Sequence, residues 1–515
     1  MKNKIFKRAV ATAATMTACL AMAVPAAMAA DSPYHVHKRV VPNDSGGYTL
    51  TLDASADKWM KQVPADVLFV NDMSGSMVQN IDSDSIPGGV TPDPSKPDYG
   101  IDLSKSRYGY VTKAMNQMVG QLAAHNASQS QNPRGQLALV KFGKYSLVYG
   151  DSTSPWGTNT AQLKADINDK KVDVDPSSSN ILTSGGTSWD AGLRAAIDTL
   201  QLDEVANDGH RKVVVFTSDG EPNTVLSDNE YAGPDSSLSQ NQYRSYNHYV
   251  KCNDDSAGRQ KAYEKAADTM RDLIAAVPGV KVISVGMGPQ SEVRRMQQIQ
   301  AIAEGKAETD TPDRYYSADS EASLNQAFAA ATQMVLPHPV TITDTLTGNV
   351  EFASTDQSAF RLTSNGQALP STAYTITVDE ASKTVTASID PDYKLTDGEP
   401  VQLQFDIVAS QSAKDQGQTP GFSYPDTGDP DTGATSAGQP GFYSNTTAKA
   451  VFSDDEGDFT TLTYAKPVIQ VETVSRVTSL PATGSMAGVL VMSSAVAAAF
   501  IALMSAMAFK RRTSR

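Results

Sequence analysis

The chain has 515 residues, with 43 basic and 57 acidic side chains and a net charge of −14. This length exceeds what a single hydrophobic core organises, so we expect two or more domains. The acidic balance argues against nucleic acid and anionic membranes as partners. The two cysteines are Cys19 and Cys252, and Cys19 lies in a segment that we expect to be removed, so no intramolecular disulfide is expected.

The first 29 residues have the pattern of a secretory signal peptide. Basic residues between Lys2 and Arg8 precede an apolar run from Ala9 to Val24, and small residues follow at 27–29. The mature chain is therefore expected to begin near Ala30 or Asp31.

Residues 31–60 contain two β-like stretches, His37 to Val41 and Gly47 to Leu52. Together they are too short to fold alone. We expect them to pair with strands that follow residue 335, so that the region between them is an inserted domain.

Residues 61–335 alternate between short apolar runs and amphipathic stretches of helical period. The apolar runs are those of strands buried on both faces: Val67 to Val70, Leu137 to Val140, Val213 to Phe216 and Val282 to Val285. This alternation predicts a doubly wound, Rossmann-like α/β domain with a parallel sheet. Ligands of such sheets bind at the carboxyl ends of the strands.

Polar motifs follow the predicted strands at that edge. Asp72, Ser74 and Ser76 come directly after the first strand, and alternate residues of an extended turn can converge on one point. A second loop, Ser184 to Thr187, opens a helix, and a later strand ends in Thr217-Ser218-Asp219-Gly220. Hydroxyl and carboxylate oxygens form a shell suited to Mg²⁺.

Together these motifs resemble the metal-ion-dependent adhesion site of von Willebrand factor A domains, over about half of the chain. The resemblance implies that Ser74, Ser76 and Thr187 bind the metal directly, and that Asp72 and Asp219 bind it directly or through water. The implied ion is Mg²⁺, with Mn²⁺ or Ca²⁺ as alternatives. Its open coordination position would accept a carboxylate of a partner, or the domain would carry a metal and no ligand.

Two insertions are expected to rim this edge. Asp82 to Asp102 is rich in Pro, Gly, Asp and Ser, and Leu226 to Asn253 is polar with four tyrosines. Long loops over a binding edge often carry specificity. They could equally be spacers packed on the domain.

Residues 336–470 predict an antiparallel β domain. Apolar and polar residues alternate in several stretches, namely 340–344, 375–378, 384–389, 401–407, 447–452 and 459–464. Residues 411–440 are rich in Gly, Pro, Asp and Gln and are expected to form a loop. With the early strands, this region would complete a β-sandwich stalk.

This arrangement resembles the isopeptide-bonded stalk domains of Gram-positive pilins and adhesins. There a strand Lys is joined to a strand Asn with the help of a buried acid. Carried over, the candidates are Lys38, Asn445 and, as the assisting acid, Asp344. Burial would lower the pKa of the lysine and raise that of the acid, so that a neutral amine could attack the carboxamide.

The C-terminus carries the pentapeptide Leu480-Pro481-Ala482-Thr483-Gly484, in a linker region spanning 471–484. Residues 485–515 follow, with an uncharged stretch, Ala487 to Phe509, that is long enough to form a transmembrane helix, and a basic tail. This order resembles the sorting signal of Gram-positive surface proteins. It implies that sortase cuts after Thr483 and joins it to peptidoglycan or to a pilin backbone subunit.

These features together favour a secreted adhesin, covalently attached to the cell wall, that binds a host or environmental protein or glycan. A minor or tip pilin is an alternative in the same location. A wall-bound enzyme with an accessory A domain is disfavoured, because the sequence has neither His-Glu-x-x-His nor Gly-x-Ser-x-Gly. A structural wall protein without a ligand is the third alternative.

Overall fold

The computed structural model describes residues 32–61, 63–93, 95–128, 135–150, 154–170, 186–226, 242–246, 249–251, 256–288, 294–433 and 436–474. The predicted signal peptide (1–29), the pentapeptide Leu480 to Gly484 and the apolar stretch Ala487 to Phe509 lie outside these residues. Within the described ranges, no helix is both long and apolar enough to cross a membrane.

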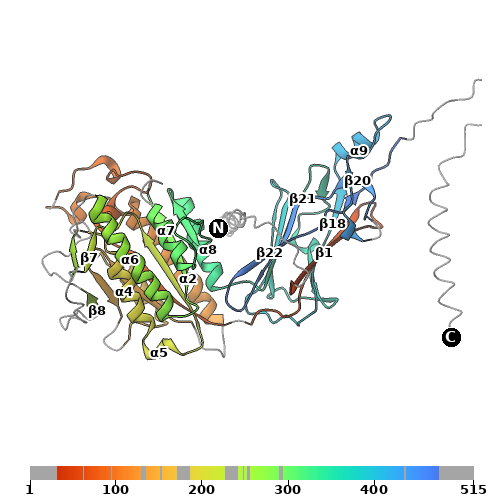
Figure 1. Ribbon diagram of the computed structural model, residues 1–515. Coiled ribbons are helices and arrows are strands. Elements are labelled where there is room, and N and C mark those ends of the chain that lie inside the picture. The colour runs from red at the N-terminus through yellow and green to blue at the C-terminus, as the bar shows by residue number, and fades with distance from the viewer. Residues whose placement is uncertain are drawn as a thin grey trace, which may run out of the picture. The chain divides into compact units, whose positions relative to one another are not determined.

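The elements from β3 to α8 form an α/β domain built on a seven-stranded sheet (Figure 1). In spatial order its strands are β11 (Tyr315–Ala318), β10 (Lys281–Met287), β6 (Arg211–Ser218), β3 (Ala65–Asp72), β4 (Leu137–Phe142), β5 (Ser146–Tyr149) and β8 (Gln242–Tyr246). The strands from β11 to β4 are parallel, and β5 and β8 add an antiparallel edge. A separate two-stranded sheet joins β7 (Thr224–Leu226) and β9 (Tyr249–Lys251).

Strand β3 is buried along its whole length because its alternate side chains enter two different cores. Val67 and Phe69 share one core with residues of α2 (Arg107–Ser128), α3 (Thr160–Asn168) and α8 (Glu321–Val335). Leu68 and Val70 share the other with residues of α4 (Trp189–Leu200), α5 (Asp203–Ala206), α6 (Ser256–Ala276) and α7 (Arg294–Ala303). This is the doubly wound arrangement that the apolar runs predict.

Helix α4 shows how local sequence sets this packing. Ser188 precedes the helix, and its hydroxyl accepts a hydrogen bond from the backbone N–H of Ala191, which satisfies one free donor at the helix start. Gly192 faces the ring of Phe142 on β4, where a Cβ would lie only 2.7 Å from the ring. The helix can therefore approach the sheet closely only because residue 192 has no side chain.

The remaining strands form a β domain with two main sheets. The first contains β1 (Tyr34–Pro42), β2 (Tyr48–Ala56), β18 (Val401–Ala409), β14 (Arg361–Ser364) and β15 (Gln367–Ala368), with β13 (Val350–Phe352) also paired to β18. The second contains β16 (Tyr374–Asp379), β17 (Thr384–Ile389), β12 (Val340–Leu346), β21 (Asn445–Ser453) and β22 (Phe459–Thr463). Because β2 pairs with β18, the α/β elements lie between strands of one sheet in the sequence.

The two sheets face each other across a shared core. Strand β12 alternates strictly between buried and half-buried residues, as expected when one face of a sheet is covered. Tyr34 of β1 stacks on Phe452 of β21, with ring centroids 4.6 Å apart. An antiparallel sandwich is therefore present where the sequence predicts one.

Residues 411–440, which were expected to form a loop, contain regular elements. They include α9 (Gln411–Gly417), β19 (Asp426–Thr427), a 3₁₀ turn (Pro430–Thr432) and the first residue of β20 (Pro440–Tyr443), which also pairs with β23 (Val468–Ile469). The hydroxyl of Ser410 accepts from the backbone N–H of Ala413, which is fully buried in α9. Caps and buried small residues thus order a segment whose composition is that of a loop.

Among the described residues, Lys414–Ser423 and 472–474 group together as a second unit. Within it, the backbone N–H of Val474 donates to the carbonyl of Gly417, and the Gln418 amide donates to the carbonyl of Glu472.

Candidate functional site

The first predicted ligand, Asp72, ends β3 at the carboxyl edge of the sheet and is fully buried. Its two carboxylate oxygens are held separately. Oδ1 accepts from the backbone N–H of Ser74 at 2.7 Å, and Oδ2 accepts from the hydroxyl of Ser218 at 2.5 Å. The carboxylate is thus fixed in orientation by the turn after β3 and by the end of β6.

A run of hydrogen bonds continues from this turn to the neighbouring strand. The hydroxyls of Ser74 and Ser76 are 3.0 Å apart, and Ser76 donates to Oδ1 of Asp219 at 2.8 Å. Asp219 follows β6 directly and is fully buried. The structure therefore brings four of the five predicted ligands together at one edge.

The fifth predicted ligand, Thr187, lies in the segment that enters α4. Its backbone N–H donates to the side-chain oxygen of Asn223 at 2.8 Å, and its carbonyl accepts from the backbone N–H of Asn223 at 3.0 Å. These bonds tie Thr187 to the chain just after Asp219. Among the described residues, no hydrogen bond joins its side chain to the other four, and Ser184 and Gly185 of the same motif lie outside them.

The two carboxylates are electrostatically costly where they stand. Burial raises the pKa of Asp72 to about 7, and the negative charge of Asp219 adds to that rise. Burial also raises the pKa of Asp219, although Arg107 opposes it by donating to Oδ2 at 2.9 Å. Oxygen donors from hydroxyls and carboxylates, with negative charge not fully offset, fit a hard divalent cation.

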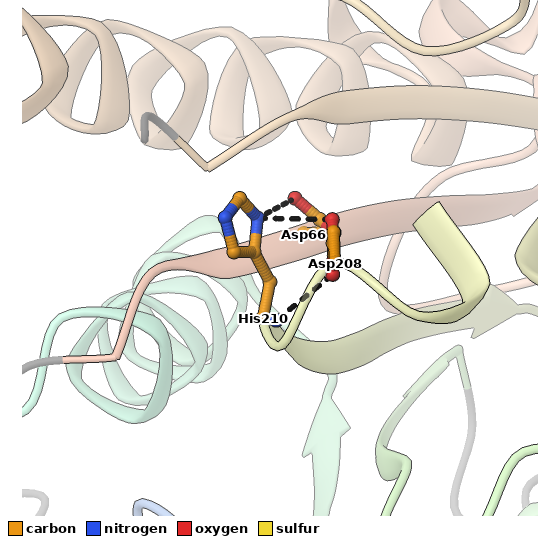
Figure 2. A group of neighbouring side chains, drawn as sticks. All are labelled: Asp66, Asp208 and His210. Atoms are coloured by element: carbon orange, nitrogen blue, oxygen red, sulfur yellow. Dashed lines mark hydrogen bonds and ion pairs between the residues drawn. The ribbon is translucent and has the colours of Figure 1, made fainter. Parts of the chain in front are cut away.

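A different group of possible metal ligands lies at the opposite end of the same strands. Figure 2 shows Asp66 of β3 with Asp208 and His210, whose ligand atoms all lie within 4.8 Å of one another. The ammonium of Lys212 is 2.8 Å from Asp66 and 2.5 Å from Asp208. Because a protein cation already pairs with both carboxylates, we interpret this group as a structural ion-pair network.

The β domain encloses the other predicted residues. Lys38 of β1 and Asp344 of β12 belong to different sheets, and their side chains are fully buried and 2.6 Å apart. Asn445 of β21 is also buried and pairs with Leu346, which shares a strand face with Asp344. The amide nitrogen of Asn445 and Oδ1 of Asp344 are buried and have no hydrogen-bond partner among the described residues.

Burial favours the neutral forms of this lysine and this acid. It lowers the pKa of Lys38 and raises the pKa of Asp344, while the attraction between the two opposes both shifts. Tyr464 is a further member that the sequence did not suggest. Its hydroxyl is buried without a described partner, and burial, together with the charges of Asp53 and Asp344, raises its pKa well above the usual value.

The sequence analysis did not identify several residues that hydrogen-bond to the predicted metal ligands. Ser218 belongs to a motif that was recognised, and it could have been found by asking which residue orients Asp72. Arg107 and Asn223 have no local pattern, because their partners come from distant segments. Only the folded chain identifies them.

The comparisons with known proteins assign the α/β domain. Residues 67–221 match the family model of the von Willebrand factor type A domain. The chain contains a von Willebrand factor A domain. Residues 338–470, in the β domain, match a family described as a domain of unknown function, DUF7604. No curated protein was found to match the chain.

Three solved structures are similar to this chain, at low sequence identity. The pilus adhesin SpaC from Lactobacillus rhamnosus GG is 16% identical, with a TM-score of 0.36 over 85% of this chain and 48% of that one. The PilB minor pilin from Streptococcus sanguinis is 16% identical, with a TM-score of 0.38 over 59% and 78%. The pilus adhesin RrgA from Streptococcus pneumoniae is 12% identical, with a TM-score of 0.31 over 85% and 66%.

This chain thus spans about half the length of the SpaC chain.

Proposed function

We propose that the chain is a cell-surface adhesin whose A domain binds its ligand through a divalent metal ion, namely Mg²⁺ or, as alternatives, Mn²⁺ or Ca²⁺. The observation that carries the proposal is the hydrogen-bonded run from Asp72 through Ser74 and Ser76 to Asp219. It places two buried carboxylates and two hydroxyls at the carboxyl edge of the sheet. A divalent cation would supply positive charge to balance the negative charge of these two carboxylates.

In this proposal Ser74, Ser76 and Thr187 hold the ion directly, and Asp72 and Asp219 hold it directly or through water. The ion, when bound, offers Lewis acidity to a carboxylate of the ligand. The protein groups around it keep the donors in place: Ser218 orients Asp72, Ser76 orients Asp219, and Asn223 positions the backbone of Thr187. We assign the chain a binding role and no enzymatic reaction.

We further propose that the β domain is a stalk closed by an amide between Lys38 and Asn445. The neutral Lys38 amine attacks the side-chain carbonyl carbon of Asn445, and protonated Asp344 donates a hydrogen bond to the carbonyl oxygen. A new C–N bond forms, the old C–N bond breaks, and the departing nitrogen takes up the amine proton to leave as ammonia. The buried Lys38–Asp344 pair and its shifted pKa values support this step.

Display on the wall is the third part of the proposal. Sortase would cleave between Thr483 and Gly484 and join Thr483 to peptidoglycan or to a pilin backbone subunit, which would place the adhesin on the wall or on a pilus. The support is the order of pentapeptide, apolar stretch and basic tail in the sequence. Thr483→Ala should move the protein from the wall fraction to membrane or medium. A variant that stays covalently bound to peptidoglycan would contradict this part.

The adhesin proposal is tested with the secreted chain, Asp31 to Thr483, on an array of host proteins and glycans with MgCl₂ or with EDTA. We expect binding to at least one class of ligand with MgCl₂, lost on chelation and lost in Asp72→Ala. Binding that survives both changes would place the ligand site away from the metal. No binding under any condition would favour a structural wall protein.

A further inference from the structure

Arg107, the first residue of α2, is fully buried, which is unusual for a charged side chain. Its guanidinium donates to Oδ2 of Asp219 at 2.9 Å and to Oδ1 of Asp84 at 3.1 Å. It also donates to the backbone carbonyls of Asn80 at 2.9 Å and Ser83 at 3.2 Å. One side chain therefore joins a predicted metal ligand to residues 80–84, where the first rim insertion begins.

The guanidinium is enclosed on a further side by the end of β10. A Cβ on Gly288, whose φ is +105°, would lie 3.1 Å from the guanidinium carbon. A side chain at position 288 would therefore crowd Arg107. The guanidinium thus places a positive charge against Oδ2 of Asp219.

The division of Asp219 between its two partners limits what it can offer a metal. Oδ1 accepts from Ser76, whose hydroxyl is itself a predicted ligand, and Oδ2 is committed to Arg107. A metal on this edge would meet a carboxylate that already pairs with a guanidinium through one of its oxygens. It would also be repelled by the guanidinium, because like charges in a poorly solvated site interact strongly.

We propose that Arg107 is an internal counter-ion that weakens metal binding at this edge and couples metal occupancy to the segment 80–84. The inference rests on the proposed metal site. When a cation binds Asp219, the interaction between Arg107 and Asp219 weakens. The remaining hydrogen-bond acceptors of Arg107 then hold more of its charge, and all of them belong to residues 80–84. Metal binding and ordering of that segment must then favour each other to the same extent.

The decisive experiment is calorimetric titration of MgCl₂, and separately MnCl₂, into the secreted chain and three variants. Arg107→Met removes the charge and keeps an unbranched side chain of similar length, and should tighten metal binding at least about tenfold. Arg107→Lys keeps the charge and should stay within about threefold of the wild type. Asp84→Asn, at a side chain that is 60% exposed, removes a carboxylate that offsets Arg107 and should weaken binding about two- to threefold.

The matched control is Asp268→Asn. Asp268 also pairs with an arginine, Arg271 at 3.0 Å, but on the exposed surface of α6, and its loss should leave the metal affinity unchanged. Hydrogen exchange supplies a second readout. Backbone amides of residues 80–85 should exchange more slowly with MgCl₂ in the wild type, and this protection should disappear in Arg107→Met.

The outcomes separate the two claims. A wild-type chain that binds neither MgCl₂ nor MnCl₂ overturns the proposed metal site, and this inference with it. A wild-type chain that binds, while folded Arg107→Met binds equally or more weakly, overturns the counter-ion role alone. Should Arg107→Met fail to fold, Asp84→Asn decides, since unchanged or tighter binding there contradicts the proposed charge balance.

Discussion

Each of the two domains buries an ion pair completely, Arg107–Asp219 in the A domain and Lys38–Asp344 in the β domain. Removing two opposite charges from water is costly in both places. The chemistry open to the pairs is different. The arginine keeps its charge, whereas a buried lysine and aspartic acid can both become neutral by passing one proton between them.

Their locations match that difference. The A-domain pair lies beside oxygen donors at a sheet edge, where an ion could enter and leave. The β-domain pair lies between two sheets, and the amide nitrogen of Asn445, which pairs with Leu346 on the strand of Asp344, has no hydrogen-bond partner among the described residues. One arrangement suits a reversible contact and the other a permanent one, although both begin from a buried cation and a buried carboxylate.

The largest expected effect breaks the β-domain pair. Asp344→Ala removes the assisting acid and leaves Lys38 buried without its partner, so the amide should not form. The intact mass should exceed that of the wild type by one ammonia after correction for the substitution. The free energy of unfolding should fall by about 3 kcal/mol or more.

Lys394→Ala, which removes an exposed lysine of the same domain, is the control and should change neither the cross-link nor the stability appreciably. A wild-type mass equal to that of the unmodified sequence, or a peptide map with Lys38 and Asn445 unlinked, would remove the covalent half of the comparison.

The next effect concerns the edge site. Asp72→Ala and Asp219→Ala should each abolish Mg²⁺ binding in calorimetry, because each removes a carboxylate from the donor set. The fold should persist, since both residues lie at the end of the sheet, but Asp219→Ala should also lower stability because it leaves the buried Arg107 without this partner. Circular dichroism checks the fold, and unchanged metal affinity in both variants would discard the assignment of these ligands.

A third variant tests whether metal binding depends on the other buried ion-pair network of the A domain. Asp66→Asn disrupts the network with Lys212 and His210 at the opposite end of β3. We expect thermal unfolding to show a loss of about 2–3 kcal/mol in stability, because a buried ammonium loses one of two partners. Metal affinity should not change. A loss of metal binding in this variant would move the metal site to the group in Figure 2.

The smallest effect is a pH dependence in the β domain. His338 is half-buried, with its Nδ1 2.6 Å from the carbonyl oxygen of Ile389, and desolvation of the ring lowers its pKa. The folded state therefore favours the neutral ring. The contribution of His338 to stability is fully present above the unfolded pKa of about 6.5, and it is lost as the pH falls from there towards the lower pKa of the folded state. His338→Gln should flatten the fall in melting temperature between about pH 6.5 and pH 5. An unchanged slope would show that other groups cause the acid sensitivity.

Sequence patterns predicted the layers of the fold well, because short apolar runs and strict alternation follow directly from burial on two faces or one. They also placed Asp72, Ser74 and Ser76, since these residues are neighbours along the chain. Arg107 was not predicted, because its partner Asp219 lies 112 residues away and no local pattern marks it. Helix α9 within the segment 411–440 was not predicted, because composition does not reveal the cap at Ser410.

The pairing of β2 with β18 has a consequence for the time course of folding. Strands β1 and β2 pair with each other and are synthesised early, but β18, which joins them to the rest of the sheet, begins only at Val401, after the entire A domain. Lys38 and Asp344 are 306 residues apart, and contacts of such long range form late and slowly. The A domain, whose strands and helices alternate along the sequence, should therefore become compact before the first two strands are joined to the rest of their sheet. The β domain closes last, and an amide formed at that moment would prevent it from reopening.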